Sequence, residues 1–219
     1  MRSGITRLIL TGVTALAAVT LSAAPAVAGQ SSDWKLGYYT PSGRALSMSS
    51  VQSRGGVASF DFTSQDNTAL LVTTKGNSPF LGDLTGKTIS ATFTISGATG
   101  AFTYDGEGTA QNPCVYPANT RFFFTTDNGG GFAFTHYWWS NPANVVLGNG
   151  TFTLTGKVEP AEWSDWNGQP GLTQTAGFAD AASNVTMVGF SFGGGCFFEN
   201  GVGTSDGSGT FTLQSFAVS

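Results

Sequence analysis

Strict alternation of apolar and hydroxylated residues is the main pattern of this sequence. Residues 88–95 read Thr-Ile-Ser-Ala-Thr-Phe-Thr-Ile, and residues 151–155 and 210–213 repeat the pattern with Thr, Phe and Leu. A period of two predicts β-strands with one buried and one wet face, which is typical of antiparallel sheets. Threonine suits the wet face because its branched side chain fits a pleated surface.

Gly, Asn, Asp and Pro dominate the breaks between further segments of strand composition,. Within residues 171–182 a helix of about two turns fits near 178–182. Because crossover helices are missing, a parallel α/β sheet is excluded. We predict an all-β fold: a two-sheet antiparallel β-sandwich of the jelly-roll type with at most one short helix. The other candidate strands are 35–39, 57–63, 68–74, 100–104, 120–126, 132–139 and 185–192, with long loops at 40–56 and 158–184.

The first 28 residues are typical of a secretory signal peptide. Arg2 and Arg7 supply the positive charge, residues 8–21 are apolar, and Ala-Val-Ala at 26–28 fits the small-residue cleavage rule,. The apolar run is short and lacks stop-transfer charges, which disfavours a membrane anchor. We therefore expect residues 1–28 to direct secretion to the extracellular space.

Residues 29–219 are expected to form a single domain. They contain no apolar run long enough to cross a membrane,. Cys114 and Cys196 are the only cysteines, and an oxidising compartment favours a disulfide between them. Free thiols and metal ligation are the alternatives.

Charge is scarce throughout the chain. Only 10% of the residues are charged, against about 25% in an ordinary soluble protein. Nine basic and 13 acidic residues give a net charge of −4, and cleavage of the signal would make the chain more acidic. Nucleic acid is therefore excluded as a partner, because no cationic patch is available for its phosphates. With 13% aromatic residues, the composition also disfavours disorder.

Nucleophilic and zinc catalysis lack the residues that they need. Residues 189–193 match the Gly-x-Ser-x-Gly pattern around Ser191, but that motif requires a later histidine, and the only histidine is His136,. A single histidine also cannot form a zinc triad. We interpret residues 189–193 as part of a strand.

Carboxylates offer two weaker candidate sites. Asp105 and Glu107 lie in a turn-rich segment where oxygen ligands could hold a calcium ion, although solvated turn carboxylates are the favoured interpretation,. A pair of acids could also cleave a glycosidic bond. The candidates for that chemistry are Asp105, Glu107, Glu159, Glu162 and Asp165.

Consecutive aromatic residues carry the most specific functional signal. Tyr137, Trp138 and Trp139 follow His136, and on a strand neighbours point to opposite faces,. One of the two Trp side chains is therefore predicted to point away from the main core. Exposed rings beside polar groups suit sugars, because rings stack on C–H faces while polar groups bond hydroxyls. Inward packing of these rings is the alternative. The candidate carbohydrate-binding residues are Tyr137, Trp138, Trp139, Trp163 and Trp166 for stacking, and His136, Asn141, Asp165 and Asn167 for hydrogen bonds.

The segments 121–124, 136–142, 163–168, 188–195 and 209–216 resemble small exported actinobacterial proteins. Their pattern is similar to galactose-binding-like jelly rolls and to carbohydrate-binding modules built on that fold. The resemblance implies a jelly roll with a short helix before the Gly-Phe-Ser-Phe strand, and carbohydrate binding. Such modules often hold a structural calcium, whereas their usual acidic ligand set is not evident in this sequence.

Three functional hypotheses follow from these features. The first is a secreted, monomeric, non-catalytic module without a cofactor that binds a polysaccharide or cell-wall glycan through exposed aromatic residues. The second is a secreted glycan-cleaving enzyme that uses loop carboxylates. The third is a structural or protein-interacting surface protein, in which an exposed aromatic patch drives association.

Overall fold

The computed structural model describes residues 33–39, 46–74, 78–104, 116–126, 131–195 and 201–219. Within these residues the chain forms two antiparallel sheets and one α-helix. The larger sheet contains β1 (Trp34–Tyr39), β2 (Leu46–Ser50), β4 (Thr68–Thr73), β6 (Phe102–Tyr104), β7 (Asn119–Thr125), β8 (Tyr137–Val146), β10 (Trp163–Asp165), β11 (Met187–Gly193) and β12 (Val202–Thr204). The smaller sheet contains β3 (Ala58–Asp61), β5 (Thr88–Ser96), β9 (Gly150–Lys157) and β13 (Thr210–Val218).

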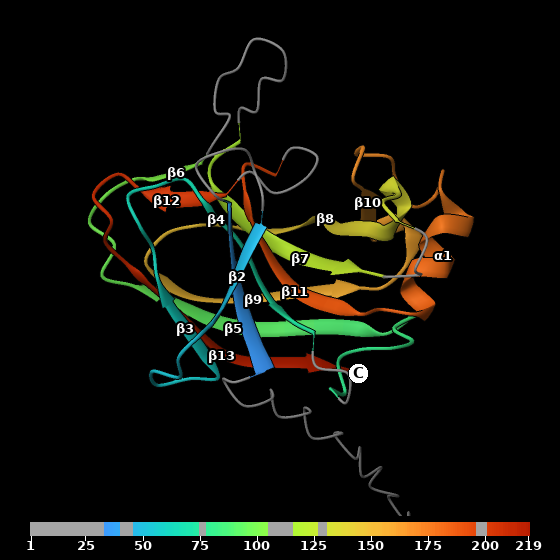
Figure 1. Cartoon of the computed structure of the whole chain (residues 1–219), viewed down its shortest axis with the longest axis horizontal. Coiled ribbons are helices and arrows are strands. Elements are labelled where there is room, and N and C mark those ends of the chain that lie inside the picture. The colour runs from blue at the N-terminus through green and yellow to red at the C-terminus, as the bar shows by residue number, and fades with distance from the viewer. Residues whose placement is uncertain (1–32, 40–45, 75–77, 105–115, 127–130, 196–200) are drawn as a thin grey trace, which may run out of the picture.

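The strand order places elements from distant parts of the chain side by side. The larger sheet runs β10-β8-β7-β11-β4-β1-β2, with β12 pairing with β4 and β6. The smaller sheet runs β3-β13-β5-β9. The helix α1 (Thr175–Ser183) lies at one end of the sandwich near β10, and β6 and β12 lie at the other end (Figure 1). Two short 3-10 helices, η2 (Phe134–His136) and η3 (Pro160–Glu162), directly precede β8 and β10.

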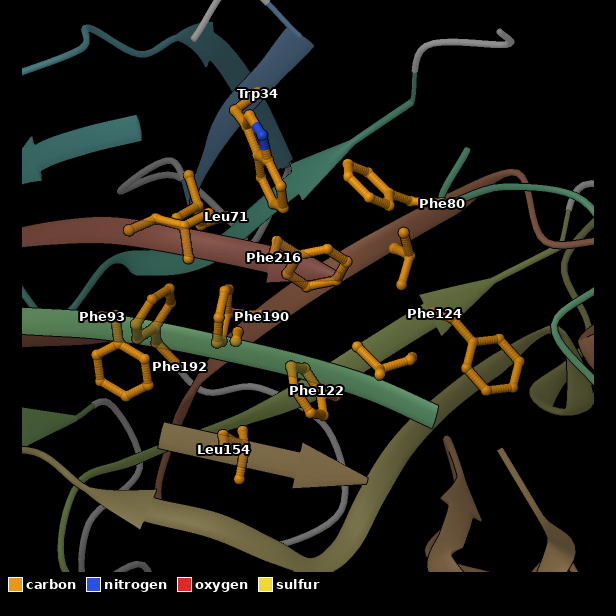
Figure 2. Packing of buried hydrophobic residues seen from close by; sticks show 14 of the residues in the cluster. Trp34, Leu71, Phe80, Phe93, Phe122, Phe124, Leu154, Phe190, Phe192 and Phe216 are labelled. Atoms are coloured by element: carbon orange, nitrogen blue, oxygen red, sulfur yellow. The ribbon is translucent and has the colours of Figure 1, made fainter. Parts of the chain in front are cut away.

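Phenylalanine side chains fill the space between the two sheets. Phe190 of β11 is fully buried, and its ring centroid lies 5.6 Å from Phe93, 5.6 Å from Phe122 and 5.7 Å from Phe211. Figure 2 shows Phe93, Phe122 and Phe190 converging from both layers. Each buried side chain of this size contributes about 1.5–3 kcal/mol to folding through removal of apolar surface from water. The inner faces of the sheets are therefore sufficient to form one core.

The predicted all-β, two-sheet antiparallel sandwich with one short helix is confirmed, and the jelly-roll class stays a prediction. Segments 88–95, 151–155 and 210–213 lie in β5, β9 and β13 as expected. The structure differs from the prediction in four places. Strand β2 forms within the expected loop 40–56, and β10 forms within the expected loop 158–184. Strand β12 was not predicted, and β8 begins only at Tyr137, after η2, and continues to Val146.

Several predicted features lie outside the described residues. These are the signal peptide at 1–28, both cysteines (Cys114 and Cys196) and the weak calcium candidates Asp105 and Glu107. Among the residues that are described, no helix has the length and apolar character needed to cross a membrane.

Candidate ligand-binding pocket

The larger sheet is apolar on its outer face as well as on its inner face. In β11 the inward positions are Val188, Phe190 and Phe192, which belong to the main core. By the alternation of strand side chains, Met187 and Gly189 then face outward. On the neighbouring strands Leu70, Val72, Phe123 and Trp139 place apolar side chains on the outer face, where polar ones are normally found,. Arg121, Thr125 and Ser191 are polar residues that share this face,.

A second cluster of buried side chains covers this outer face. It consists of Ala69, Leu70, Val72, Phe123 and Trp139, and we call it the outer apolar layer. Val72 pairs with Gly189, Gly189 with Phe123, and Phe123 with Trp139, so these residues form one row across four strands. The layer is separate from the core between the sheets.

Gly189 leaves a gap in that row. A Cβ atom at this position would lie 2.1 Å from the carbonyl oxygen of Leu71 and 2.8 Å from the Cα of Val72. Both contacts are to the backbone of β4, which cannot move aside as a flexible side chain can. The close approach of β11 to β4 therefore requires glycine, and it leaves the sheet surface between Val72 and Phe123 without a side chain.

A pocket with a volume of about 730 Å³ opens on the outer face of the larger sheet, where Leu70 and Phe123 of the outer apolar layer line it. This volume lies in the range of small-molecule sites, which is about 300–1,000 Å³. The described lining contains no Asp, Glu, Lys or Arg, so it favours an uncharged ligand. The lining residues are Tyr39, Leu46, Leu70, Thr74, Phe123, Thr125, Thr126, Gly131, His136, Tyr137, Trp166, Thr186 and Met187.

A cluster of aromatic rings forms one wall of the pocket. The Trp166 ring lies 5.3 Å from Tyr137, 5.4 Å from Phe132 and 5.8 Å from Trp139, all in edge-to-face geometry. Trp166 and Tyr137 are half-buried and line the pocket, whereas Phe132 is 59% exposed and packs against both rings from outside the lining. Edge-to-face packing fixes the rings in position while Trp166 and Tyr137 keep part of their surface accessible.

A tight turn after β10 holds Trp166 at the wall. The buried Asp165 carboxylate accepts hydrogen bonds from the backbone N–H groups of Asn167 (2.9 Å) and Gln169 (2.8 Å). Gly168 closes the turn with a positive φ of 74° and donates to the Asp165 carbonyl. Asp165 therefore satisfies backbone donors of this turn, and its side chain does not line the pocket.

Hydroxyl groups of threonine and tyrosine provide most of the polar side chains of the lining, beside the His136 imidazole and the Trp166 indole. Thr125 Oγ1 donates to the carbonyl of His136 (2.7 Å), and Thr186 Oγ1 donates to the carbonyl of Thr125 (3.3 Å). Since each proton is committed to a carbonyl, both oxygens present lone pairs to a further partner. The pocket can therefore accept hydrogen bonds from ligand hydroxyls at these two threonines.

The nine predicted carbohydrate-binding residues divide into three that line the pocket, two that are exposed elsewhere and four that are buried, among them Asp165 in its turn. Tyr137, His136 and Trp166 come together in the pocket. Asn141 and Asn167 are exposed and do not line it.

The other three predicted stacking residues are buried. Trp138 and Trp139 are 0% exposed and Trp163 is 1% exposed. Trp138 packs in the main core and donates its indole N–H to the carbonyl of Thr135, and Trp163 donates to the carbonyl of Lys157. Fully buried rings present no face to a ligand, so these three are corrected from binding residues to packing residues.

The aliphatic part of the lining was missed. Leu46, Leu70 and Met187 line the pocket beside the aromatic wall. A signal for Leu70 and for the apolar outer face was present in two runs that break the alternation, Ala-Leu-Leu-Val at 69–72 and Phe-Phe-Phe at 122–124. A continuous apolar run indicates a strand that is buried on both faces.

The clearly shifted carboxylates lie away from the pocket. Asp206 accepts hydrogen bonds from Ser208 and Thr99, which lower its pKa to about 2. Hydrogen bonds from Thr210 and Arg54 lower the pKa of Asp61. Both groups stabilise local structure at turns and strand ends, and neither lines the pocket.

Comparisons of the chain with protein-family models, with curated proteins and with solved structures found no match.

Proposed function

We propose that this protein is a secreted, non-catalytic binding module whose pocket takes a neutral carbohydrate. The observation that carries the proposal is the half-buried pair of Tyr137 and Trp166 on the wall of an uncharged pocket. The C–H face of a sugar ring stacks on such rings, and its hydroxyls need nearby acceptors. Thr125 and Thr186 supply those acceptors.

The lining supports binding rather than glycosidic cleavage. Cleavage requires two carboxyl groups about 5–10 Å apart on either side of the scissile bond. No carboxyl group is present among the described lining residues. Of the acids considered for this role, Asp165 is buried and committed to its turn, and the Glu162 carboxylate accepts a hydrogen bond from the backbone N–H of Lys157.

Affinity electrophoresis against a panel of soluble neutral polysaccharides tests the proposal. At least one polysaccharide should retard the protein, and Trp166→Ala should abolish the retardation because the stacking ring is lost. Tyr116→Ala is the matched control, since Tyr116 is 61% exposed and does not line the pocket. The proposal fails if no glycan retards the protein, or if Trp166→Ala binds as tightly as the control.

A further inference from the structure

The pocket lining changes in character along the strand order of the larger sheet. On β7, β8 and the turn after β10 it consists of rings and hydroxyls, represented by Trp166, Tyr137 and Thr125. On β11, β4 and β2 it contains the aliphatic side chains Met187, Leu70 and Leu46, with Tyr39 at the end of β1 and Thr74 after β4 beside them. We call these the ring side and the aliphatic side. The order β10-β8-β7-β11-β4-β1-β2 separates them across the sheet.

The aliphatic side is formed by specific packing. A Cβ atom at Gly37 in β1 would lie 3.0 Å from Leu46 Cδ1, 3.0 Å from Met48 Sδ and 3.3 Å from Leu70 Cβ. The absence of a side chain at Gly37 therefore lets Leu46 and Met48 lie close over β1 and against Leu70. Leu46 remains 40% exposed, so this apolar surface is accessible.

A sugar ring stacked on Tyr137 and Trp166 would leave the aliphatic side chains Leu46, Leu70 and Met187 without an apolar partner. A pyranose presents hydroxyls around its edge, and each one buried without a partner loses its hydrogen bond to water. Leu46, Leu70 and Met187 provide no such partner in their side chains. From β8 to β1 the sheet covers four interstrand spacings, roughly 19 Å, which leaves room for a ring and an apolar group side by side.

We propose that the ligand is a neutral glycoside with an apolar alkyl or aryl substituent. The sugar ring lies against Tyr137 and Trp166, and the substituent lies against Leu46, Leu70 and Met187. The absence of Lys and Arg from the described lining disfavours an anionic group at either side. This inference rests on the proposed function, because it assigns the sugar to the ring side.

Isothermal titration calorimetry on the purified protein, with paired probes, tests this inference. The probes are the methyl and octyl β-glycosides of glucose, galactose and mannose below their micelle concentrations, together with 1-octanol. For at least one sugar the octyl glycoside should bind about tenfold or more tighter than the methyl glycoside, because burial of CH₂ groups adds affinity. It should also bind about tenfold or more tighter than octanol, because stacking adds affinity.

Variants on the ring side and on the aliphatic side separate the affinity that each side contributes. Leu46→Ser and Met187→Gln should reduce the octyl affinity by about fivefold and leave the methyl affinity unchanged. Trp166→Ala should weaken both glycosides. Leu172→Ser is the control, because Leu172 is 64% exposed and lies outside the lining.

Other outcomes of these experiments would contradict either this inference or the proposed function. Equal affinities for methyl and octyl glycosides overturn this inference and leave the proposed function standing. Equal affinities for octanol and the octyl glycoside overturn the proposed function. If no octyl glycoside binds while a polysaccharide retards the protein, the inference of an apolar substituent is overturned, and the proposed sugar-binding function still stands. A dimer that Leu46→Ser dissociates, measured by sedimentation, overturns the inference in favour of a second copy of the chain.

Discussion

The outer faces of the two sheets are built from opposite chemistry. On the smaller sheet, the hydroxyls of Thr92 and Thr153 lie 3.3 Å apart, and those of Thr94 and Thr151 lie 3.0 Å apart, across β5 and β9. On the larger sheet the corresponding positions carry the outer apolar layer, with Phe123 at its centre. The inner faces of both sheets contribute to the same core. An apolar outer face is therefore not needed on either sheet to form that core.

This difference places the candidate pocket on the outer face of the larger sheet. A hydroxylated face stays in water at little cost, whereas an exposed apolar patch favours association unless something covers it. The outer apolar layer itself is buried and packs like a core, and the apolar surface that stays accessible beside it includes Leu46 and Met187 of the pocket lining. The predictions below test that contrast in order of decreasing expected effect.

Trp139→Ala should cause the largest loss of stability. Trp139 is fully buried in the outer apolar layer and packs 5.1 Å from Phe123. Truncation of a buried Trp costs about 3–5 kcal/mol, so urea unfolding should show a loss of this size. A loss as small as that caused by Thr92→Ala would mean that the outer face is not packed like a core.

Gly189→Ala should reduce stability by about 1–3 kcal/mol, because the new methyl group would overlap the β4 backbone,. Thermal unfolding measures this effect. Gly148→Ala is the matched control, since a Cβ atom there meets nothing within 4 Å. Equal melting temperatures for the two variants would contradict the close approach of β11 and β4.

Trp166→Ala should separate binding from stability. The ring is half-buried, so its removal should cost less than the roughly 3–5 kcal/mol expected for a fully buried Trp. Retardation by a polysaccharide should nevertheless be abolished. The comparison of unfolding with electrophoresis checks both parts. A variant that unfolds as easily as Trp139→Ala would place Trp166 among the packing residues.

Replacing hydroxyls on the smaller sheet should leave stability almost unchanged. The double variant Thr92→Val and Thr153→Val removes one hydroxyl pair from a solvent-facing position, so unfolding should shift by no more than about 0.5 kcal/mol per site. Glycan binding should stay at the wild-type level in electrophoresis. Weakened binding would show that this face also contacts the ligand.

Acid should produce the smallest effect, through Asp206. Hydrogen bonds lower its folded-state pKa to about 2 from an ordinary value of 3.8. The carboxylate therefore stabilises the fold above pH 4, and this contribution is lost as the pH falls from about 4 towards 2. Asp206→Asn should flatten this part of the pH profile of unfolding. An unchanged profile would contradict the assigned hydrogen bonds.

The sequence predicted the smaller sheet better than the larger one. Alternation identifies a strand with one wet face, and β5, β9 and β13 are of that kind. In β4 and β7 every residue is buried, so hydrophobic period alone cannot say which side faces the core,. The two-sided burial of these strands depends on partners that are distant in sequence.

Burial on both faces of the larger sheet also explains where the prediction for the tryptophans was wrong. Alternation correctly indicates that Trp138 and Trp139 point to opposite faces, and they belong to the inner and outer clusters respectively. The predicted exposure of one of them is wrong, because Trp139 on the outer face is buried by its neighbours in the outer apolar layer and by Tyr137 and Trp166. Trp166 keeps an accessible surface because it follows β10 in a turn at the sheet edge.

The uneven burial of the tryptophans gives this protein an optical probe of its own pocket. Trp34, Trp138 and Trp139 are 0% exposed and Trp163 is 1% exposed, so only Trp166 is open to a soluble quencher. Acrylamide or iodide should therefore reduce only the part of the emission that comes from the pocket wall. A bound ligand would protect that part, and occupancy of the site becomes readable without a label.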